Sequence, residues 1–210
     1  MRKGILFDLD GTLWDSSQEV TDAWNLCLRT QTDRSEQFTI DDMHGFMGKT
    51  LEAIAALMFP SLPTNEQIRL IKMCTATEHE YLLTHSARLY DGERDILRKL
   101  SEEYTLGVVS NCQDGYIQIY LQQCGFPELF SDFECAGRTG LSKGQNIRLV
   151  MERQGIEQCW YVGDTQGDCD AANEAVIPFI HAGYGFGSVD HSAAVLRDLR
   201  ELPDVMARIG

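Results

Sequence analysis

Basic side chains are scarce in this sequence, which has 18 lysines and arginines against 32 aspartates and glutamates and a net charge of −14. Nucleic acids and anionic membrane surfaces are bound through clustered lysines and arginines. We therefore expect neither of them as a partner. An anionic substrate would need a local positive charge, from a metal ion or a positioned lysine, to overcome the repulsion of the whole chain.

Long apolar runs are also absent. The mean hydropathy is −0.23, and no stretch approaches the roughly 20 apolar residues that cross a bilayer. The basic start, Met1 to Lys3, precedes an apolar run that is too short for a secretory signal. The seven cysteines contain no Cys-x-x-Cys pair, so we expect reduced thiols rather than a disulfide or zinc framework. Together these absences predict a cytoplasmic protein.

What the sequence does contain is an alternation of predicted strands and helices. Residues 4–7 form a short apolar run typical of a buried strand, whereas residues 16–88 have apolar side chains at helical spacing only. From residue 89 onward, predicted strands alternate with predicted helices, which is typical of a parallel sheet with right-handed crossovers. The strands are expected at 105–109, 130–135, 159–162 and 178–181, and the helices at 96–100, 116–123, 145–154, 170–175 and 193–199.

The simplest architecture is an α/β core with a helical segment inserted after its first strand. We place the core at residues 1–15 and 89–210 and the helical domain at residues 16–88. A chain of 210 residues is long enough for one good core and a smaller second one.

Two aspartates, Asp8 and Asp10, follow the first predicted strand and precede Gly11, a residue that breaks strands. Ligands of open α/β sheets bind at the carboxyl ends of the strands. Alternation would turn both carboxylates toward one place, where like charges repel unless a cation or a shared proton intervenes. For this motif alone, an acidic turn at the end of a strand is the simpler interpretation.

Three later segments add polar side chains at predicted strand ends or helix starts. Ser110 and Asn111 end one strand, and a hydroxyl, an amide and free backbone N–H groups can hold an anion there. Lys143 precedes a predicted helix, and alone it reads as a solvated lysine. Asp164 and Asp168 flank a strand-to-helix turn beside glycines, which favours a hard cation such as Mg²⁺.

Taken together and in this order, the four motifs resemble those of the haloacid dehalogenase-like hydrolase superfamily. Residues 13–16, Leu-Trp-Asp-Ser, and residues 182–185, Ala-Gly-Tyr-Gly, look like its phosphoglycolate phosphatase-like branch. The resemblance covers nearly the whole chain. It implies a Rossmann-like parallel sheet between two helical layers, a three-layer α/β/α core, with an inserted helical cap.

The resemblance also implies roles for single residues. Asp8 would attack phosphorus and form an aspartyl-phosphate, and Asp10 would protonate the leaving alkoxide and then activate water. Ser110, the backbone N–H of Asn111, and Lys143 would hold the phosphoryl group.

A magnesium ion is the cofactor that the resemblance implies. It would be held by the carboxylates of Asp8 and Asp164 and by the backbone carbonyl of Asp10, with Asp168 acting through water. The metal and the lysine would stabilise negative charge in the transition state.

Departures from the family pattern narrow the function. Asp10 argues against the dehalogenases, which lack this second acid. The β-phosphoglucomutase-like branch carries a cap histidine where this chain has Val20, which counts against a sugar-phosphate mutase. Gly144 stands where many relatives have proline, which should loosen the loop. In the cap, Lys49 either contacts the substrate or is an exposed lysine in a first helical turn.

The leading prediction is a Mg²⁺-dependent phosphatase acting on a small phosphorylated metabolite through an aspartyl-phosphate, with phosphoglycolate as the first trial substrate. Two alternatives stay open. One is a sugar-phosphate mutase of the β-phosphoglucomutase-like kind, and the other is a signalling or binding module switched by aspartate phosphorylation. The helical insertion and Asp10 count against the module.

Overall fold

A computed structural model describes all residues from Met1 to Gly210. Its centre is a six-stranded parallel sheet with the order β5-β4-β1-β6-β7-β8. Strand β1 lies inside the sheet between β4 and β6, and its side chains from Gly4 to Phe7 are buried, as is usual for parallel strands covered on both faces. The strands are β1 Lys3–Phe7, β4 Thr105–Ser110, β5 Phe130–Cys135, β6 Gln158–Gly163, β7 Phe179–Ala182 and β8 Ala194–Leu196.

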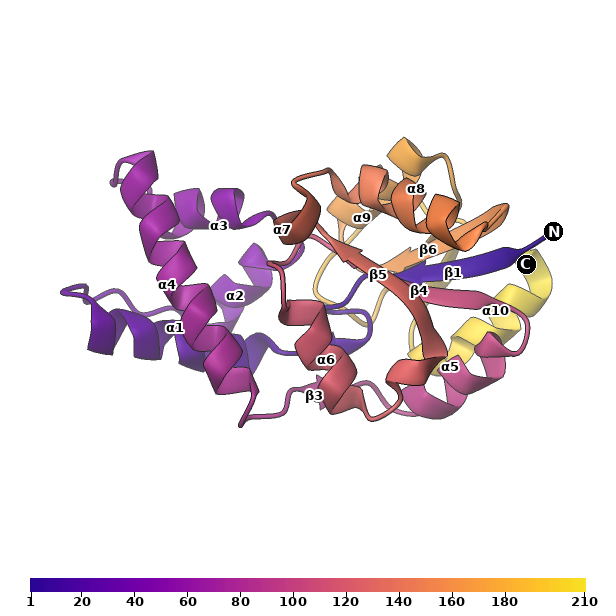
Figure 1. Cartoon of the computed structure of the whole chain (residues 1–210), viewed down its shortest axis with the longest axis horizontal. Helices are drawn as coiled ribbons and strands as arrows, with labels where there is room; N and C mark the ends of the chain where they lie inside the picture. The colour runs from indigo at the N-terminus through magenta and orange to yellow at the C-terminus, as the bar shows by residue number, and fades with distance from the viewer.

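Helices cover both faces of this sheet (Figure 1). A cluster of 29 buried residues joins one face to α5, α6 and α10, and a cluster of 12 joins the other to α8 and α9. The predicted three-layer α/β/α core is therefore confirmed. The core helices are α5 Glu93–Ser101, α6 Tyr116–Cys124, α7 Ala136–Thr139, α8 Lys143–Gln154, α9 Gln166–Ala175 and α10 Leu202–Ile209, and 3₁₀ turns occur at Pro127–Leu129 and Leu199–Glu201.

Four further helices lie beside the sheet and have a core of their own (Figure 1). Fourteen buried hydrophobic residues of this segment form a cluster separate from the two that cover the sheet. The helices are α1 Ser17–Gln31, α2 Ile40–Phe46, α3 Leu51–Met58 and α4 Thr64–Leu82. The connections into and out of this helical segment pair as two short antiparallel strands, β2 Trp14–Asp15 and β3 Arg88–Leu89, which the sequence pattern does not predict.

The helix predicted over residues 193–199 is wrong. Residues Ala194–Leu196 form β8, which pairs in parallel with β7, and the last helix begins only at Leu202. The burial along β8 has the period of a strand, because Val195 is exposed between half-buried Ala194 and buried Leu196. Pairing with the open edge of β7 outweighs the local helical preference of the two alanines.

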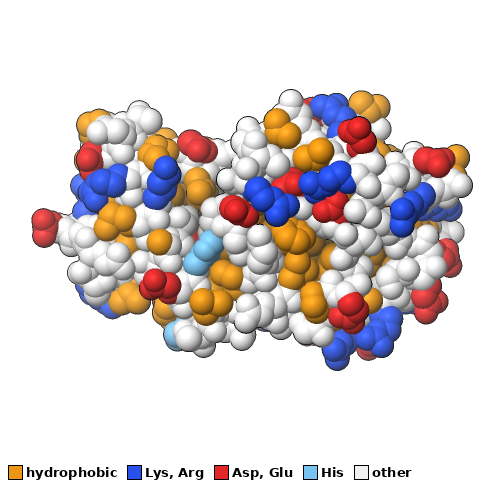
Figure 2. All heavy atoms as spheres, viewed as in Figure 1, with side chains coloured by type: hydrophobic (Ala, Val, Ile, Leu, Met, Phe, Trp, Pro, Cys, Tyr) orange, Lys and Arg blue, Asp and Glu red, His pale blue; other side chains and the backbone are white.

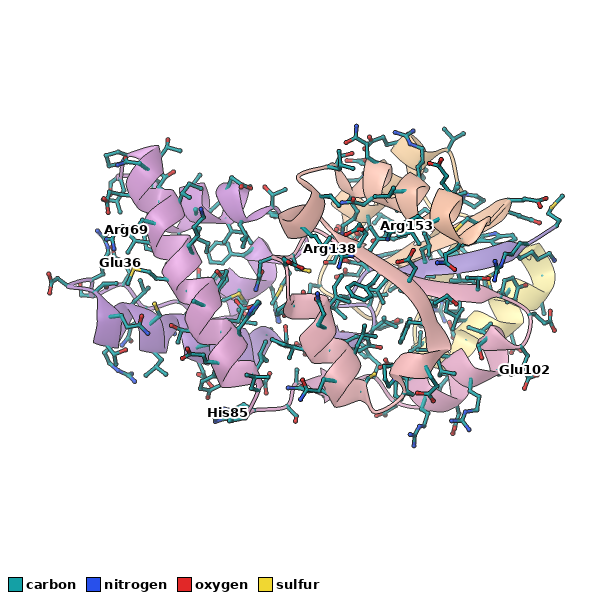
Figure 3. The ribbon with its side chains drawn as sticks, viewed as in Figure 1. Glu36, Arg69, His85, Glu102, Arg138 and Arg153 are labelled. Carbon is teal, nitrogen blue, oxygen red and sulfur yellow. The ribbon has the colours of Figure 1, made fainter.

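The opposite edge of the sheet carries charged side chains. Arg153 of α8 contacts Asp132 of β5 at 2.8 Å and Glu134 at 2.7 Å, and Arg138 contacts Glu134 at 2.6 Å. Figure 2 shows acidic and basic groups interspersed on this face, and Figure 3 shows both arginines beside β5. Charged side chains on an edge strand hinder pairing with another chain.

All seven cysteines are free thiols, and all but Cys112 are buried. None of the helices combines the length and the apolar character that crossing a lipid bilayer requires.

Candidate active site

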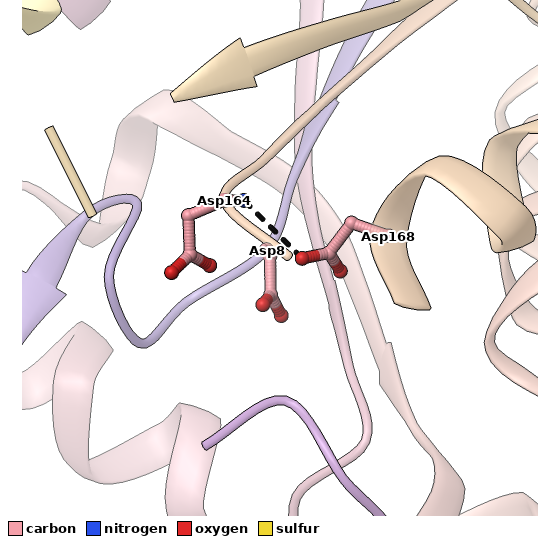
Figure 4. Close-up of side chains that lie close together, drawn as sticks. All are labelled: Asp8, Asp164 and Asp168. Carbon is pink, nitrogen blue, oxygen red and sulfur yellow. Dashed lines mark hydrogen bonds between the residues drawn. The ribbon is translucent and has the colours of Figure 1, made fainter. Parts of the chain in front are cut away.

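Three buried aspartates meet at the carboxyl edge of the sheet (Figure 4). Asp8 directly follows β1, Asp164 directly follows the neighbouring β6, and Asp168 lies in the first turn of α9. Each can offer one carboxylate oxygen within 4.8 Å of the others. The strand order thus brings together residues that are far apart in the sequence, in a group able to hold a metal ion.

Lys143 is the one lysine bonded to these carboxylates. Its Nζ lies 3.0 Å from Oδ1 of Asp8 and 2.6 Å from Oδ1 of Asp168. Burial lowers the pKa of this ammonium, but Asp168 and Asp8 raise it by more, so that the net shift is upward and the lysine stays charged. Lys143 begins α8 behind a capping box formed by Ser142 and Gln145, which fixes the start of the helix.

Gly144, which was expected to loosen a loop, lies in a helical turn instead. Gly144 is buried in the first turn of α8, and a Cβ there would stand only 2.5 Å from Oε2 of Glu174. The glycine allows α8 and α9 to pack closely behind Lys143. The ammonium is therefore held by a tight helical turn.

One ammonium does not balance three buried carboxylates. Burial and the charge of Asp168 raise the pKa of Asp8 to about 7 although Lys143 lowers it, and burial and Asp168 raise the pKa of Asp164 well above its usual range. Oδ1 of Asp164 is buried and has no hydrogen-bond partner. A divalent cation would supply both the missing charge and a partner for this oxygen, so the residues present fit Mg²⁺.

Asp168 holds the other two groups in place. Its Oδ2 accepts hydrogen bonds from the backbone N–H of Asp164 at 3.2 Å, and from the N–H and Oγ1 of Thr165 at 2.9 and 2.7 Å. Its Oδ1 accepts from Lys143. Both oxygens are thus engaged with protein groups, which orient Asp164 and Lys143.

Asp10 lies apart from this group, in a different set of hydrogen bonds. Its Oδ1 accepts from Nε1 of Trp14 at 2.8 Å, from Oγ of Ser16 at 2.7 Å and from the hydroxyl of Tyr116 at 2.9 Å. Burial raises the pKa of Asp10, and the three hydrogen bonds oppose that shift. All three donors act on the same oxygen, which leaves Oδ2 for a substrate.

These partners of Asp10 were missed from the sequence. Trp14 and Ser16 follow Asp10 closely, but Tyr116 is 106 residues away and comes from α6. The signal that could have found the first two is the cluster of a donor-bearing indole and a hydroxyl just after the Gly11 turn.

Two glycines permit the close packing of this site. Gly11 has φ +77°, and a Cβ on it would stand 2.3 Å from Oδ2 of Asp164. A Cβ on Gly185 would stand 2.4 Å from Cβ of Asp164 and from the carbonyl oxygen of Gly11. Any larger side chain at either position would displace Asp164.

The remaining predicted residues line a cavity of about 50 Å³ between the four-helix segment and the core. Ser110 ends β4 at the wall of this cavity, and Nδ2 of Asn111 donates to the carbonyl oxygen of Gly48 at 2.9 Å. Lys49 follows Gly48, is exposed, and lines the same cavity. The structure thus brings Ser110, Asn111 and Lys49 to the cavity that Asp10 also lines.

Glu78 in α4 also lines this cavity, and sequence reasoning missed it. It is buried, as are Leu70 and Cys74 of the same helix. The signal was available, because the spacing of four residues places Glu78 on the apolar face of α4. A glutamate at such a position is unusual unless something there needs it.

Comparisons with known proteins place the chain in a family. The family model described as haloacid dehalogenase-like hydrolase matches residues 5–182. A phosphoglycolate phosphatase of Xanthomonas campestris is 28% identical over 88% of this chain and 84% of its own length. A 5'-nucleotidase of Pseudomonas aeruginosa is 26% identical over 90% of this chain and 86% of its own.

Solved structures agree on the fold. The crystal structure of a predicted phosphoglycolate phosphatase from Haemophilus somnus covers 98% of both chains with a TM-score of 0.83 and 22% identity. A haloacid dehalogenase-superfamily hydrolase of subfamily IA from Geobacter sulfurreducens has a TM-score of 0.71 and 20% identity, over 98% of this chain and 96% of its own. The chain belongs to the haloacid dehalogenase-like hydrolase family and is an enzyme of its phosphatase type.

Proposed function

We propose that this enzyme is a Mg²⁺-dependent phosphatase that hydrolyses a small phosphate monoester through an aspartyl-phosphate on Asp8. The observation that supports the proposal is that the two aspartates have different surroundings. Asp8 is ion-paired with Lys143 beside Asp164, whereas Asp10 sits in a separate set of neutral hydrogen-bond donors. One carboxylate is therefore suited to act as nucleophile, and the other to carry a proton.

In the first step, a carboxylate oxygen of Asp8 forms a bond to phosphorus while the bond from phosphorus to the alcohol oxygen breaks. Asp10 gives its proton to the departing oxygen. In the second step, Asp10 takes a proton from water, and the resulting hydroxide attacks phosphorus. The bond to Asp8 breaks, which releases inorganic phosphate and restores both carboxyl groups.

The surrounding residues hold the phosphoryl group. Nζ of Lys143 offers positive charge beside Asp8, and Ser110 with the backbone N–H of Asn111 offers donors from the end of β4. Asp8, Asp164 and the backbone carbonyl of Asp10 would hold Mg²⁺, with Asp168 supporting them through water. The ion would supply further positive charge against the phosphoryl oxygens.

Residues 16–88 would act as a cap that closes over this site, and Lys49 would contact the substrate from the cap. Phosphoglycolate is the first trial substrate, because the Xanthomonas campestris relative carries that name. The cap histidine of the β-phosphoglucomutase-like branch is replaced here by Val20, which lines the cavity and cannot transfer a proton.

The test is phosphate release from p-nitrophenyl phosphate with Mg²⁺ and with EDTA. We expect EDTA to abolish release and Asp8→Asn to reduce it by at least about a thousandfold, since the nucleophile is lost. Asp204→Asn, an exposed aspartate in α10, is the matched control and should keep the full rate. A fully active Asp8→Asn enzyme would show that the nucleophile lies elsewhere.

A further inference from the structure

The cavity between the helical segment and the core is lined by two carboxyl groups, that of Asp10 on the core side and that of Glu78 on α4. Ser110 lies on the core side as well. Much of the remaining wall is apolar, with Val20, Trp24, Met43, Phe46, Leu51 and Ile54. A leaving group bonded to phosphorus near Asp10 would extend toward this wall and Glu78.

Glu78 is held only by neutral donors. Nε1 of Trp24 donates to its Oε2 at 2.5 Å, and Nε2 of Gln113 donates to its Oε1 at 2.6 Å. The side chain forms no ion pair with any lysine, arginine or histidine, although the residue is only 2% exposed. Each oxygen keeps a lone pair for a further donor.

The charge balance of the cavity favours a donor over an acceptor. Burial raises the pKa of Glu78 to about 8, and the charge of Asp10 acts in the same direction. A buried carboxylate without a cation is costly, and a bound ammonium or hydroxyl would reduce that cost. A bound ammonium would hold Glu78 in its charged form, which has only acceptor oxygens. Without a cation that form predominates only above about pH 8, so the selection against a bound carboxylate is expected there. The only lysine on the wall is Lys49, and it is exposed.

We propose that Glu78 recognises a hydrogen-bond donor, an ammonium or a hydroxyl group, on the alcohol part of the substrate, and so selects against an alcohol part that ends in a carboxylate. This inference rests on the proposed phosphatase function. It makes Glu78 the residue that determines specificity and narrows the substrate to monoesters of short amino alcohols or diols.

The size of the cavity limits the length of the alcohol part. A volume of about 50 Å³ has room for roughly four water-sized groups. The apolar wall suits a chain of two or three methylene groups, with the donor at its far end against Glu78.

Four esters of similar size test the proposal: 2-aminoethyl phosphate, 2-hydroxyethyl phosphate, n-propyl phosphate and phosphoglycolate. We expect the kcat/KM of the amine or of the alcohol to exceed that of the propyl ester and of phosphoglycolate by at least about tenfold, because an unfilled or repelled buried acceptor is costly. The comparison of amine with alcohol identifies which donor Glu78 prefers.

Glu78→Gln should reduce that preference at least about fivefold, mainly through KM, because its amide replaces one acceptor oxygen by a donor. Glu80→Gln changes an exposed glutamate of the same helix and should leave all four values unchanged. Equal rates on all four esters in the wild-type enzyme would overturn the proposal. The proposal would also be overturned if the wild-type enzyme preferred phosphoglycolate and the Lys49→Met variant lost that preference.

Binding separates this inference from the proposed function. Calorimetry with Mg²⁺ should show that 3-aminopropylphosphonate or 3-hydroxypropylphosphonate binds at least about tenfold more tightly than butylphosphonate, since the first two offer a donor, all three have the same length, and none of them can be hydrolysed. An enzyme that hydrolyses no ester but keeps this preference refutes the proposed function alone. Equal binding of the three phosphonates would refute the role of Glu78. This test uses the wild-type protein, so its outcome does not depend on whether a variant folds.

Discussion

Removing the hydroxyl of Tyr116 tests whether Asp10 is the acid that protonates the leaving alcohol. This hydroxyl is one of three donors to Oδ1 of Asp10, at 2.9 Å. A hydrogen bond to a charged group is worth roughly 1.5–3 kcal/mol. Because Trp14 and Ser16 remain, we take the low end, about 1.5 kcal/mol, which corresponds to about one pKa unit.

The direction of the shift follows from which form is stabilised. The hydrogen bond from Tyr116 stabilises the carboxylate and lowers the pKa of Asp10, so its removal in Tyr116→Phe raises that pKa. In the proposed mechanism Asp10 carries a proton in the first step, so activity should be lost as the pH rises through its pKa. The alkaline limb of the pH profile should therefore move up by about one pH unit.

The assay is single-turnover release of an alkyl alcohol at saturating substrate, measured from neutral to alkaline pH. An alkyl phosphate is needed because its alkoxide leaves poorly without a proton, whereas p-nitrophenolate leaves unaided and should show a smaller effect. Tyr120→Phe is the matched control, since this buried tyrosine of the same helix donates to Glu93 instead. An alkaline limb that stays in place or moves down in Tyr116→Phe would refute the role of Asp10.

Other changes should have distinct effects. Gly185→Ala should weaken Mg²⁺ activation about tenfold, because the new Cβ would stand 2.4 Å from Asp164; a titration of activity against Mg²⁺ checks this, and unchanged activation would contradict it. Lys143→Met should lower kcat at least about a hundredfold by removing the cation beside Asp8, while Lys99→Met, on an exposed helix end, should not. Burial raises the pKa of Glu93 from 4.5 to about 8. The contribution of this group to the free energy of unfolding should therefore be greatest below pH 4.5 and should fall as the pH rises toward 8. Urea unfolding of Glu93→Gln should show a flatter pH dependence over that range, and an unchanged slope would refute the assignment.

The sequence predicts well which residues lie at the carboxyl ends of the strands. Buried parallel strands appear in it as short apolar runs, and each predicted strand end carries distinctive polar residues. Asp8, Ser110 and Asp164 could be placed together from that pattern alone once the strands were taken as neighbours. Their roles in catalysis stay predictions. The family and the parallel fold are confirmed.

The contacts that depend on three-dimensional packing could not be predicted. Tyr116 reaches Asp10 from a helix that begins about a hundred residues later, and Glu78 reaches the cavity from a segment whose packing against the core no local pattern records. The local sequence predicts a helix where β8 lies, because an Ala-Val-Leu run becomes extended only through its pairing with β7. In each case the deciding partner is remote in the sequence.

The pairing of β2 with β3 has a consequence for the history and the engineering of this fold. Asp15 and Arg88 are cross-strand partners, so the chain leaves the core and returns to it at points roughly 5 Å apart. A segment whose ends meet can be exchanged for another, or replaced by a tight turn, without opening the sheet that it leaves. We therefore expect the helical segment to be exchangeable at this one pair of strands while the sheet keeps its fold.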